Sequence, residues 1–154
     1  MSRVERTTLI NSPTELVFQF HDDPRNLLKI LPPYLRVDIV EAPKSLKRGA
    51  VLKYAMFVGP LRFDWTGEIV EYESPSQFVD IQTKGPFHNY RHAHVFVPEG
   101  SGTRMTDIIE YELPLGPLAE LANRIHFQSR LEEVLKHGQQ MTRTLLEETP
   151  KSKG

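Results

Sequence analysis

The middle of the chain, from Arg36 to Leu113, is a succession of short runs with the residue pattern of β-strands. Alternation of apolar and polar side chains with a period of two is typical of strands with one covered face. Turn-forming glycine, proline and serine residues separate the runs, so successive strands are expected to pair as antiparallel hairpins. The predicted strands are Arg36–Glu41, Val51–Val58, Leu61–Glu73, Gln77–Lys84, His88–Val97 and Thr103–Leu113.

A further strand and two short helices are predicted before these six strands. Val4–Ile10 is rich in β-branched residues, which favour strands. Ser12 then fits a helix N-cap and Glu15 the third position of a capping box, so a first helix is expected over Pro13–Phe20. A second short helix is expected over Asp23–Leu31, where two prolines follow and end it.

After Gly116 the apolar positions recur every three or four residues, which predicts an amphipathic helix of about 30 residues. One stripe is Phe127, Leu131, Val134, Gly138, Met141 and Leu145, and a second, slightly rotated stripe is Leu118, Leu121, Ala122 and Ile125. The rotation indicates either a bend or a helix that contacts two surfaces. A helix of this length needs a large apolar surface to lie on, and a strongly curved sheet provides one.

These elements predict an α+β protein. A curved antiparallel sheet of six to seven strands wraps around the long C-terminal helix, and two short helices follow the first strand. With 154 residues, the chain is expected to form one domain over residues 1–149. The lysine-bearing tail, 150–154, is expected to fray.

Composition removes several classes of function. The net charge is −1 and 25% of the residues are charged, so no nucleic-acid-binding field is indicated. The absence of cysteine excludes a disulfide framework, a Cys-ligated zinc and a thiol nucleophile. No apolar run reaches the roughly 18 residues that stable membrane insertion needs. Since the N-terminus does not resemble a signal peptide, we expect a cytoplasmic protein.

Two neighbouring strands carry titratable side chains on otherwise apolar faces. Alternate side chains share a face, so Tyr90, His92, His94 and Phe96 project together, as do Thr103, Met105, Asp107, Ile109 and Tyr111. This mixture suits neither a dry core nor a solvated surface, and it is typical of a pocket wall. Trp65 shares a face with Gly67 and is interpreted either as core or as a cover for a ligand.

The pair His92 and His94 is a candidate metal site. Both imidazoles lie on one face of a strand, and Asp107 on the next strand is the obvious third ligand. No second ligand-rich motif accompanies the pair. The sequence therefore favours histidines of a polar pocket wall or of the surface, and it predicts no metal and no cofactor.

Acid–base catalysis is the second interpretation of these residues. A histidine beside an aspartate is held in one tautomer and is poised near neutral pH. Tyr111 or Tyr90 would then donate a hydrogen bond to a substrate carbonyl and stabilise an enolate. The candidate catalytic residues are therefore His92, His94, Asp107 and Tyr111. The alternative is a hydrogen-bond network that only satisfies the polar groups of a pocket wall.

Several short segments, in this order along the chain, resemble a known superfamily. They are Ser12-Pro13 with Val17-Phe18, Gly67-Glu68-Ile69, Pro75 to Asp80, Gly85-Pro86-Phe87, the strand with Tyr90, His92, His94 and Phe96, Thr103 to Asp107, and Tyr111 with Pro114 and Gly116. The chain resembles the START-like superfamily, also called SRPBCC or helix-grip proteins, and within it the bacterial polyketide-cyclase-like and ligand-binding members. The resemblance implies a cavity between sheet and C-terminal helix that holds lipids, polyketides or other apolar molecules. It implies no common chemistry.

The leading hypothesis is therefore a protein that binds a hydrophobic or amphipathic small molecule, as a monomer or homodimer. A cyclase or dehydratase that uses a histidine as base is the alternative, and a protein-interaction module is a third. The expected ligand-binding residues are Trp65, Tyr90, His92, His94, Phe96, Met105, Asp107, Ile109, Tyr111, Val134, Gly138 and Met141.

Overall fold

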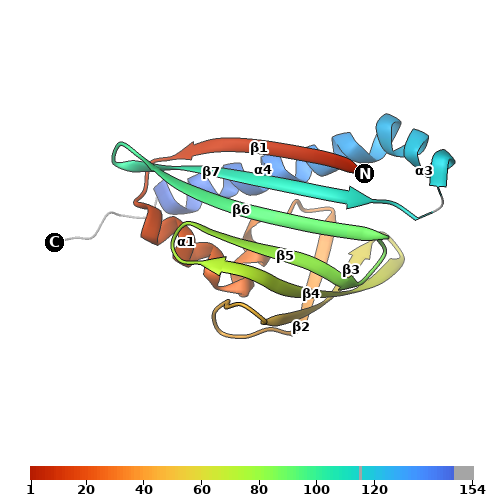
Figure 1. Cartoon of the computed structure of the whole chain (residues 1–154), viewed down its shortest axis with the longest axis horizontal. Coiled ribbons are helices and arrows are strands. Elements are labelled where there is room, and N and C mark those ends of the chain that lie inside the picture. Colours follow the sequence, from red (N-terminus) through yellow and green to blue (C-terminus); the bar gives the residue numbers. More distant parts are fainter. Residues whose placement is uncertain (115, 148–154) are drawn as a thin grey trace.

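A seven-stranded antiparallel sheet forms the main layer of the protein (Figure 1). The computed structural model describes residues 1–114 and 116–147, so the tail expected to fray lies outside the described residues. The strands are β1 (Ser2–Ile10), β2 (Leu35–Glu41), β3 (Val51–Val58), β4 (Leu61–Glu73), β5 (Gln77–Lys84), β6 (Asn89–Glu99) and β7 (Gly102–Glu112). Their order in the sheet is β1-β7-β6-β5-β4-β3-β2, which confirms the predicted meander and α+β class.

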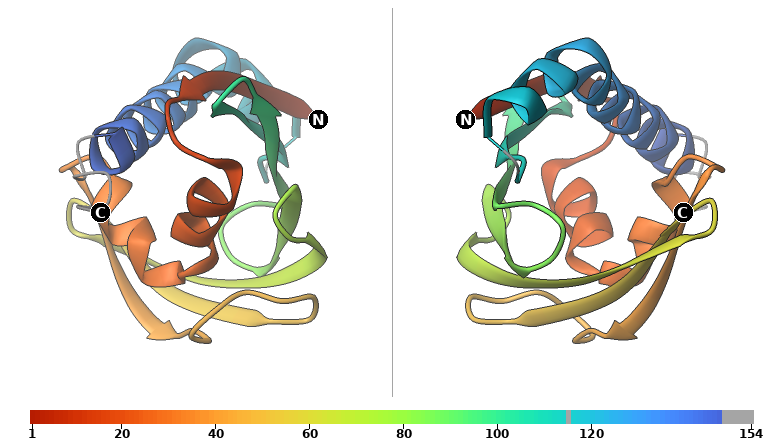
Figure 2. Two further views of the ribbon diagram at one scale, coloured as in Figure 1. Left: turned by 90° about the vertical axis from the view of Figure 1, so that its left-hand side faces the viewer. Right: turned by 90° about the vertical axis from the view of Figure 1, so that its right-hand side faces the viewer.

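The first strand forms one edge of the sheet and pairs with the last strand. Ser2 pairs with Tyr111 and Ile10 pairs with Thr103, so β1 is the neighbour of β7. The remaining strands pair with their neighbours in sequence. Figure 2 shows the sheet bending around the short helices that follow β1. This curvature gives the sheet an inner face, on which the apolar side chains gather.

The short helices confirm the predicted positions but not the predicted cap. Helix α1 spans Thr14–Asp22, a 3₁₀ turn η1 spans Pro24–Asn26, and α2 spans Leu27–Ile30. The N-cap residue of α1 is Pro13, and no side chain caps the helix, so the capping role expected of Ser12 is wrong. The Ser12 carbonyl instead accepts a hydrogen bond from the hydroxyl of Thr103, which ties the start of the helix to β7.

The C-terminal helix is interrupted by a π-helical turn. Helix α3 spans Gly116–Ala122, the π turn η2 spans Asn123–Phe127, and α4 spans Gln128–Glu147. A π turn widens the helix locally and rotates the residues that follow, which accounts for the two rotated stripes. Of the second stripe, Leu121 is exposed, and the side chains of Leu118 and Ile125 lie outside the described part. No helix in the described ranges is both long and apolar enough to cross a bilayer.

Helix α4 faces the sheet with a different line of residues from the predicted one. The stripe that contains Val134, Gly138 and Met141 is half-buried, whereas the buried line is Leu135, Gln139 and Thr142. Gln139 and Thr142 are polar, so a search for apolar spacing does not find this line. Their burial is tolerated because both side chains donate hydrogen bonds inside the protein.

The inner face carries two apolar clusters. The first, beside α1, includes Phe18, Phe78, Phe96 and Met105. The second, beside α4, includes Val4, Ile109, Tyr111 and Leu135. Along β7, Asp107 lies between Met105 of the first cluster and Ile109 of the second. A polar strip therefore separates the two clusters on the inner face.

Candidate functional site

Four titratable side chains meet in the polar strip between the two clusters. Strand β6 contributes His92 and His94, β5 contributes Asp80, and β7 contributes Asp107. In the sheet register His92 lies opposite Asp80, and His94 lies opposite Asp107. Directly opposed residues of antiparallel strands project to the same face, so the pairing brings all four together. We call Asp80, His92, His94 and Asp107 the His/Asp network.

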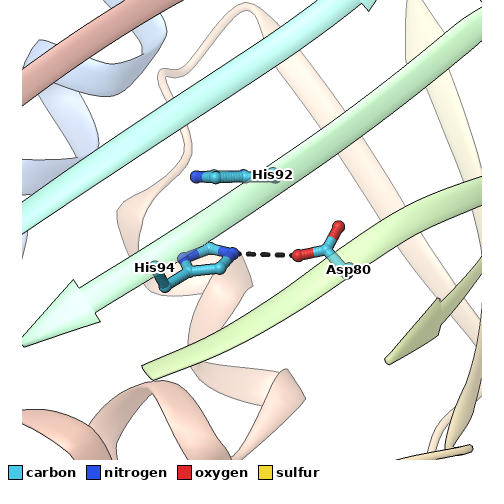
Figure 3. Close-up of side chains that lie close together, drawn as sticks. All are labelled: Asp80, His92 and His94. Atoms are coloured by element: carbon cyan, nitrogen blue, oxygen red, sulfur yellow. Dashed lines mark hydrogen bonds and ion pairs between the residues drawn. The ribbon is translucent and has the colours of Figure 1, made fainter. Parts of the chain in front are cut away.

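Two hydrogen bonds and one ion pair connect the four side chains in series. His94 donates from Nε2 to Asp80 Oδ2 over 2.9 Å (Figure 3). Nδ1 of His94 lies 3.3 Å from Asp107 Oδ1. His92 donates from Nε2 to the same Asp107 oxygen over 2.8 Å. Because ionised carboxylates only accept hydrogen bonds, Nε2 of His92 and Nε2 of His94 each carry a proton.

The charges of the network follow from these bonds. Burial disfavours the charged form of His94, but the hydrogen bonds to Asp107 and Asp80 outweigh it and raise the pKa of His94 to about 9. Burial alone would raise the pKa of Asp107, but the hydrogen bonds from His92 and His94 hold that pKa well below its usual value. At neutral pH the network therefore contains an imidazolium between two carboxylates.

A side chain of α4 fixes Asp107 from the other side. Gln139 donates from Nε2 both to Asp107 Oδ2 and to the backbone carbonyl of Arg6, each over 2.8 Å. These two bonds set the orientation of the amide, and its buried Oε1 has no hydrogen-bond partner among the described residues. The network therefore ends at an unused acceptor, which suits a hydrogen-bond donor from outside the chain.

Aromatic rings hold the histidines in place. The rings of His92 and His94 are stacked with centroids 3.7 Å apart, and Phe78 stacks on the other face of His94 at 4.1 Å. Tyr90 precedes His92 by two residues on β6, and Trp65 packs edge-on against Tyr90 with ring centroids 4.7 Å apart. Burial, followed by the charges of Asp80 and Asp107, raises the pKa of Tyr90, so its hydroxyl stays protonated.

The network retains contact with solvent despite its place inside the sheet. The side chains of His92 and His94 are each 14% exposed, Asp107 is 12% exposed and Asp80 is 21% exposed. Tyr54, Phe63 and Phe87 are also only half-buried. In a closed apolar core these side chains would have no solvent-exposed surface. The network is therefore not fully closed off from solvent.

The structure separates the predicted site residues into two groups. His92, His94 and Asp107 are brought together as expected, with Tyr90 beside His92 and Trp65 against Tyr90. The others lie in the apolar clusters or on the half-buried stripe of α4: Phe96, Met105, Ile109 and Tyr111 are 2% exposed or less, and Val134, Gly138 and Met141 are half-buried.

Tyr111 is held away from the network. Its hydroxyl donates a short hydrogen bond to the Oδ1 of Asn123 in the π turn, and its ring packs against Phe87 and Phe127. Asn123 in turn donates to the hydroxyl of Ser2. These contacts connect the π turn to the ends of β1 and β7.

Sequence reasoning missed Asp80 and Gln139. Asp80 alternates with Phe78 and Gln82 on β5, so the period-two rule applied to this strand would have placed it on the inner face. No comparable signal marks Gln139, because a glutamine on a helix with many polar residues is ordinary.

Two hollows on the surface are separate from the network. They have volumes of about 520 and 560 Å³ and share Arg143 and Glu147 of α4 as lining residues. The first also includes the β6–β7 turn around Gly100. Neither is lined by a residue of the His/Asp network.

Comparison with known proteins agrees with this fold. Residues 1–147 match the family model described as polyketide cyclase / dehydrase and lipid transport. The chain belongs to this family. The match confirms the resemblance to START-like, helix-grip proteins that the sequence indicated. No curated protein matches the chain.

Solved structures similar to this member of the polyketide cyclase/dehydrase and lipid transport family come from bacteria and plants. Ms6760 from Mycobacterium smegmatis is 23% identical with a TM-score of 0.71, over 96% of this chain and 92% of that one. CV1439 from Chromobacterium violaceum is 13% identical with a TM-score of 0.75, over 96% and 99%. Major latex-like protein 151 from Panax ginseng is 15% identical with a TM-score of 0.66, over 94% and 97%. The TM-scores show that these proteins share the fold of this chain.

Proposed function

We propose that this protein binds an amphipathic small molecule, lipid-like or polyketide-like, whose polar group sits at the His/Asp network. The observation that carries the proposal is a strip of solvent-accessible titratable groups between two apolar clusters on the inner face of the sheet. Binding sites for small molecules combine mostly apolar walls with a few polar groups that fix orientation. Membership in a family described by lipid transport and polyketide cyclisation agrees with this chemistry.

The charges of the network favour a particular kind of polar group. Two carboxylates flank one imidazolium, and Gln139 Oε1 is a further acceptor without a partner. A ligand hydroxyl would donate to one of these acceptors, whereas a ligand carboxylate would meet Asp80 and Asp107 with like charge. We therefore propose a neutral, hydroxyl-bearing ligand rather than a free fatty acid.

A cyclase or dehydratase activity is the second candidate, and one contact favours it. His92 donates from Nε2 to Asp107, so its Nδ1 is the nitrogen left to accept a proton. This is the arrangement that abstracts a proton next to a carbonyl. The His92→Gln variant would then lose turnover of a polyketide-like substrate while ligand binding persists.

Ligand titration tests the binding proposal. A fatty alcohol and the fatty acid of equal chain length are added while the fluorescence of Trp65, the only tryptophan, is followed. The alcohol is expected to bind at least about tenfold more tightly, a difference of about 1.4 kcal/mol. His94→Gln should weaken alcohol binding by a similar factor, whereas His88→Gln, the same change at an exposed histidine, should not.

Two results would contradict the binding proposal. One is the absence of binding by any apolar probe, together with the absence of any extractable molecule in native mass spectra of the purified protein. The other is equal affinity for alcohol and acid in the wild type and in His94→Gln, which would remove the network from the site.

The location and assembly of the protein stay predictions. We infer a cytoplasmic protein, and fractionation of cells that produce it tests this location. A monomer or homodimer without nucleic acid is expected, and sedimentation at two protein concentrations measures the assembly state.

A further inference from the structure

The His/Asp network also contains the donor set of a transition-metal site. Asp80, His92 and His94 each offer one ligand atom, and these three atoms lie within 4.8 Å of one another. They come from two paired strands, β5 and β6, so the backbone of the sheet fixes their relative positions. Figure 3 shows the two rings stacked on one strand with the carboxylate beside them.

Asp107 occupies the position of an outer carboxylate for both histidines. It accepts a hydrogen bond from Nε2 of His92 and lies beside Nδ1 of His94. The nitrogens not engaged by Asp107 are therefore Nδ1 of His92 and Nε2 of His94. Metal-binding histidines usually donate their second ring N–H to a carboxylate, which fixes the tautomer and the orientation of the ring. Gln139 in turn holds Asp107, so this outer contact is itself supported.

We propose that Asp80, His92 and His94 bind a divalent transition metal of the Zn²⁺ class, with Asp107 as the outer carboxylate. In a tetrahedral site the ligand atoms are about 3.3 Å apart, given metal–ligand bonds of about 2.0–2.1 Å. The three ligand atoms now lie within 4.8 Å of one another, so metal binding requires them to move closer together. The ion takes the place of the proton that His94 now donates to Asp80.

The local charge also favours a cation. Asp80 and Asp107 are mostly buried, and in the described part of the chain their only ion-pair partners are histidines. Arg6 lies opposite Asp107 in the register but forms no ion pair with it. A dication would balance both carboxylates. Two imidazoles and one carboxylate favour Zn²⁺, Co²⁺, Ni²⁺ or Fe²⁺ over Mg²⁺ and Ca²⁺, which prefer oxygen ligands.

Three protein ligands leave one position of a tetrahedral ion open. Closed sites with four protein ligands are structural, whereas three ligands and an open position bind water or a small molecule. The solvent contact of His92 and Asp80 agrees with an open position. The inference goes beyond the proposed lipid-like ligand, and its test uses the metal ion alone.

Metal titration of the chelator-treated protein tests this site. Calorimetry with Zn²⁺ is expected to give one ion per chain, and Co²⁺ should produce the strong visible absorption of a tetrahedral site. Asp107→Asn should weaken binding by about 10- to 100-fold, as outer-contact changes do. Asp80→Asn should weaken it more, and Asp64→Asn, on an aspartate whose side chain is 80% exposed, should leave it unchanged.

The order of these effects decides the proposal. It is overturned if the wild type binds no Zn²⁺, or if Asp80→Asn binds as tightly as the wild type, which would point to exposed histidines. Co²⁺ in the wild type gives a second readout that needs no variant: two paramagnetically shifted imidazole N–H resonances, one from each histidine. Their absence from a stoichiometric Co²⁺ complex also contradicts the proposal. Fatty-alcohol affinity is measured separately, so failure of one proposal is distinguishable from failure of the other.

Discussion

His21 is expected to destabilise the protein in mild acid. The histidine lies at the end of α1 with its Nδ1–H donated to the Val17 carbonyl over 2.9 Å, and its ring contacts Phe96. Burial lowers the pKa of His21 to about 4, against smaller opposing effects of the Val17 bond and of Asp107. The histidine is therefore neutral in the folded protein over the pH range in which an unfolded chain protonates it.

The sign and size of the effect follow from this difference. Below pH 6.5 the unfolded state binds a proton at His21, and the folded state does not until the pH approaches 4. Stability is therefore lost as the pH falls through this window. The lowering from 6.5 to about 4 corresponds to about 3 kcal/mol at about 1.4 kcal/mol per pH unit, as an upper value.

Urea unfolding at a series of pH values measures the loss. The matched variant is His21→Asn, because an asparagine amide keeps a donor near Nδ1 but does not titrate. The wild type is expected to lose about 2–3 kcal/mol more than the variant between about pH 7 and pH 4. Asp107, whose pKa is lowered in the folded state, begins to lose its own stabilising contribution near pH 4, but this loss is common to both proteins and cancels in the comparison. Parallel pH profiles of the two proteins would refute the reasoning.

Two further substitutions test the separation of site and core. Gly138→Ala should stabilise the protein by up to about 1 kcal/mol in thermal or urea unfolding, because an added Cβ would lie at ordinary contact distances of 3.6 and 3.8 Å from atoms of Ile30. Lower stability of the variant would show that α2 and α4 lie closer together than these distances indicate. Tyr111→Phe should cost about 1–3 kcal/mol by leaving Asn123 without its donor and should not change fatty-alcohol affinity; weaker binding at unchanged stability would return Tyr111 to the site.

Much of the sheet could be predicted because its turns are marked by particular residues. Val51–Val58, Leu61–Glu73 and Gln77–Lys84 match the observed strands, and Gly59-Pro60 and Ser74-Pro75 separate them. Glycine and proline limit the backbone in ways that a local pattern records. The element order then identifies the fold, since a long helix after a meander has few ways to cover its apolar stripe.

The site could be predicted only in part because it depends on register and helix phase. His92 and His94 share a face of β6 by simple alternation, and Asp107 falls on the apolar face of β7 by the same rule, so the sequence indicates all three. Asp80 joins them only through the pairing of β5 with β6, which the sequence does not state. Gln139 requires the rotation of α4, and apolar spacing indicated a neighbouring line of residues instead. Polar contacts between distant segments carry no periodic signal.

The hydrogen bonds of Gln139 join segments that are far apart in the sequence, which affects how the protein folds during synthesis. Gln139 on α4 donates a hydrogen bond to the Asp107 carboxylate on β7 and another to the backbone carbonyl of Arg6 on β1. The sheet lacks its β1 edge pairing until β7 has left the ribosome, and the network lacks its last contact until α4 follows. Contacts between segments so distant in sequence form slowly. A nascent chain therefore exposes the unpaired β1 and the unfinished site until α4 has been synthesised.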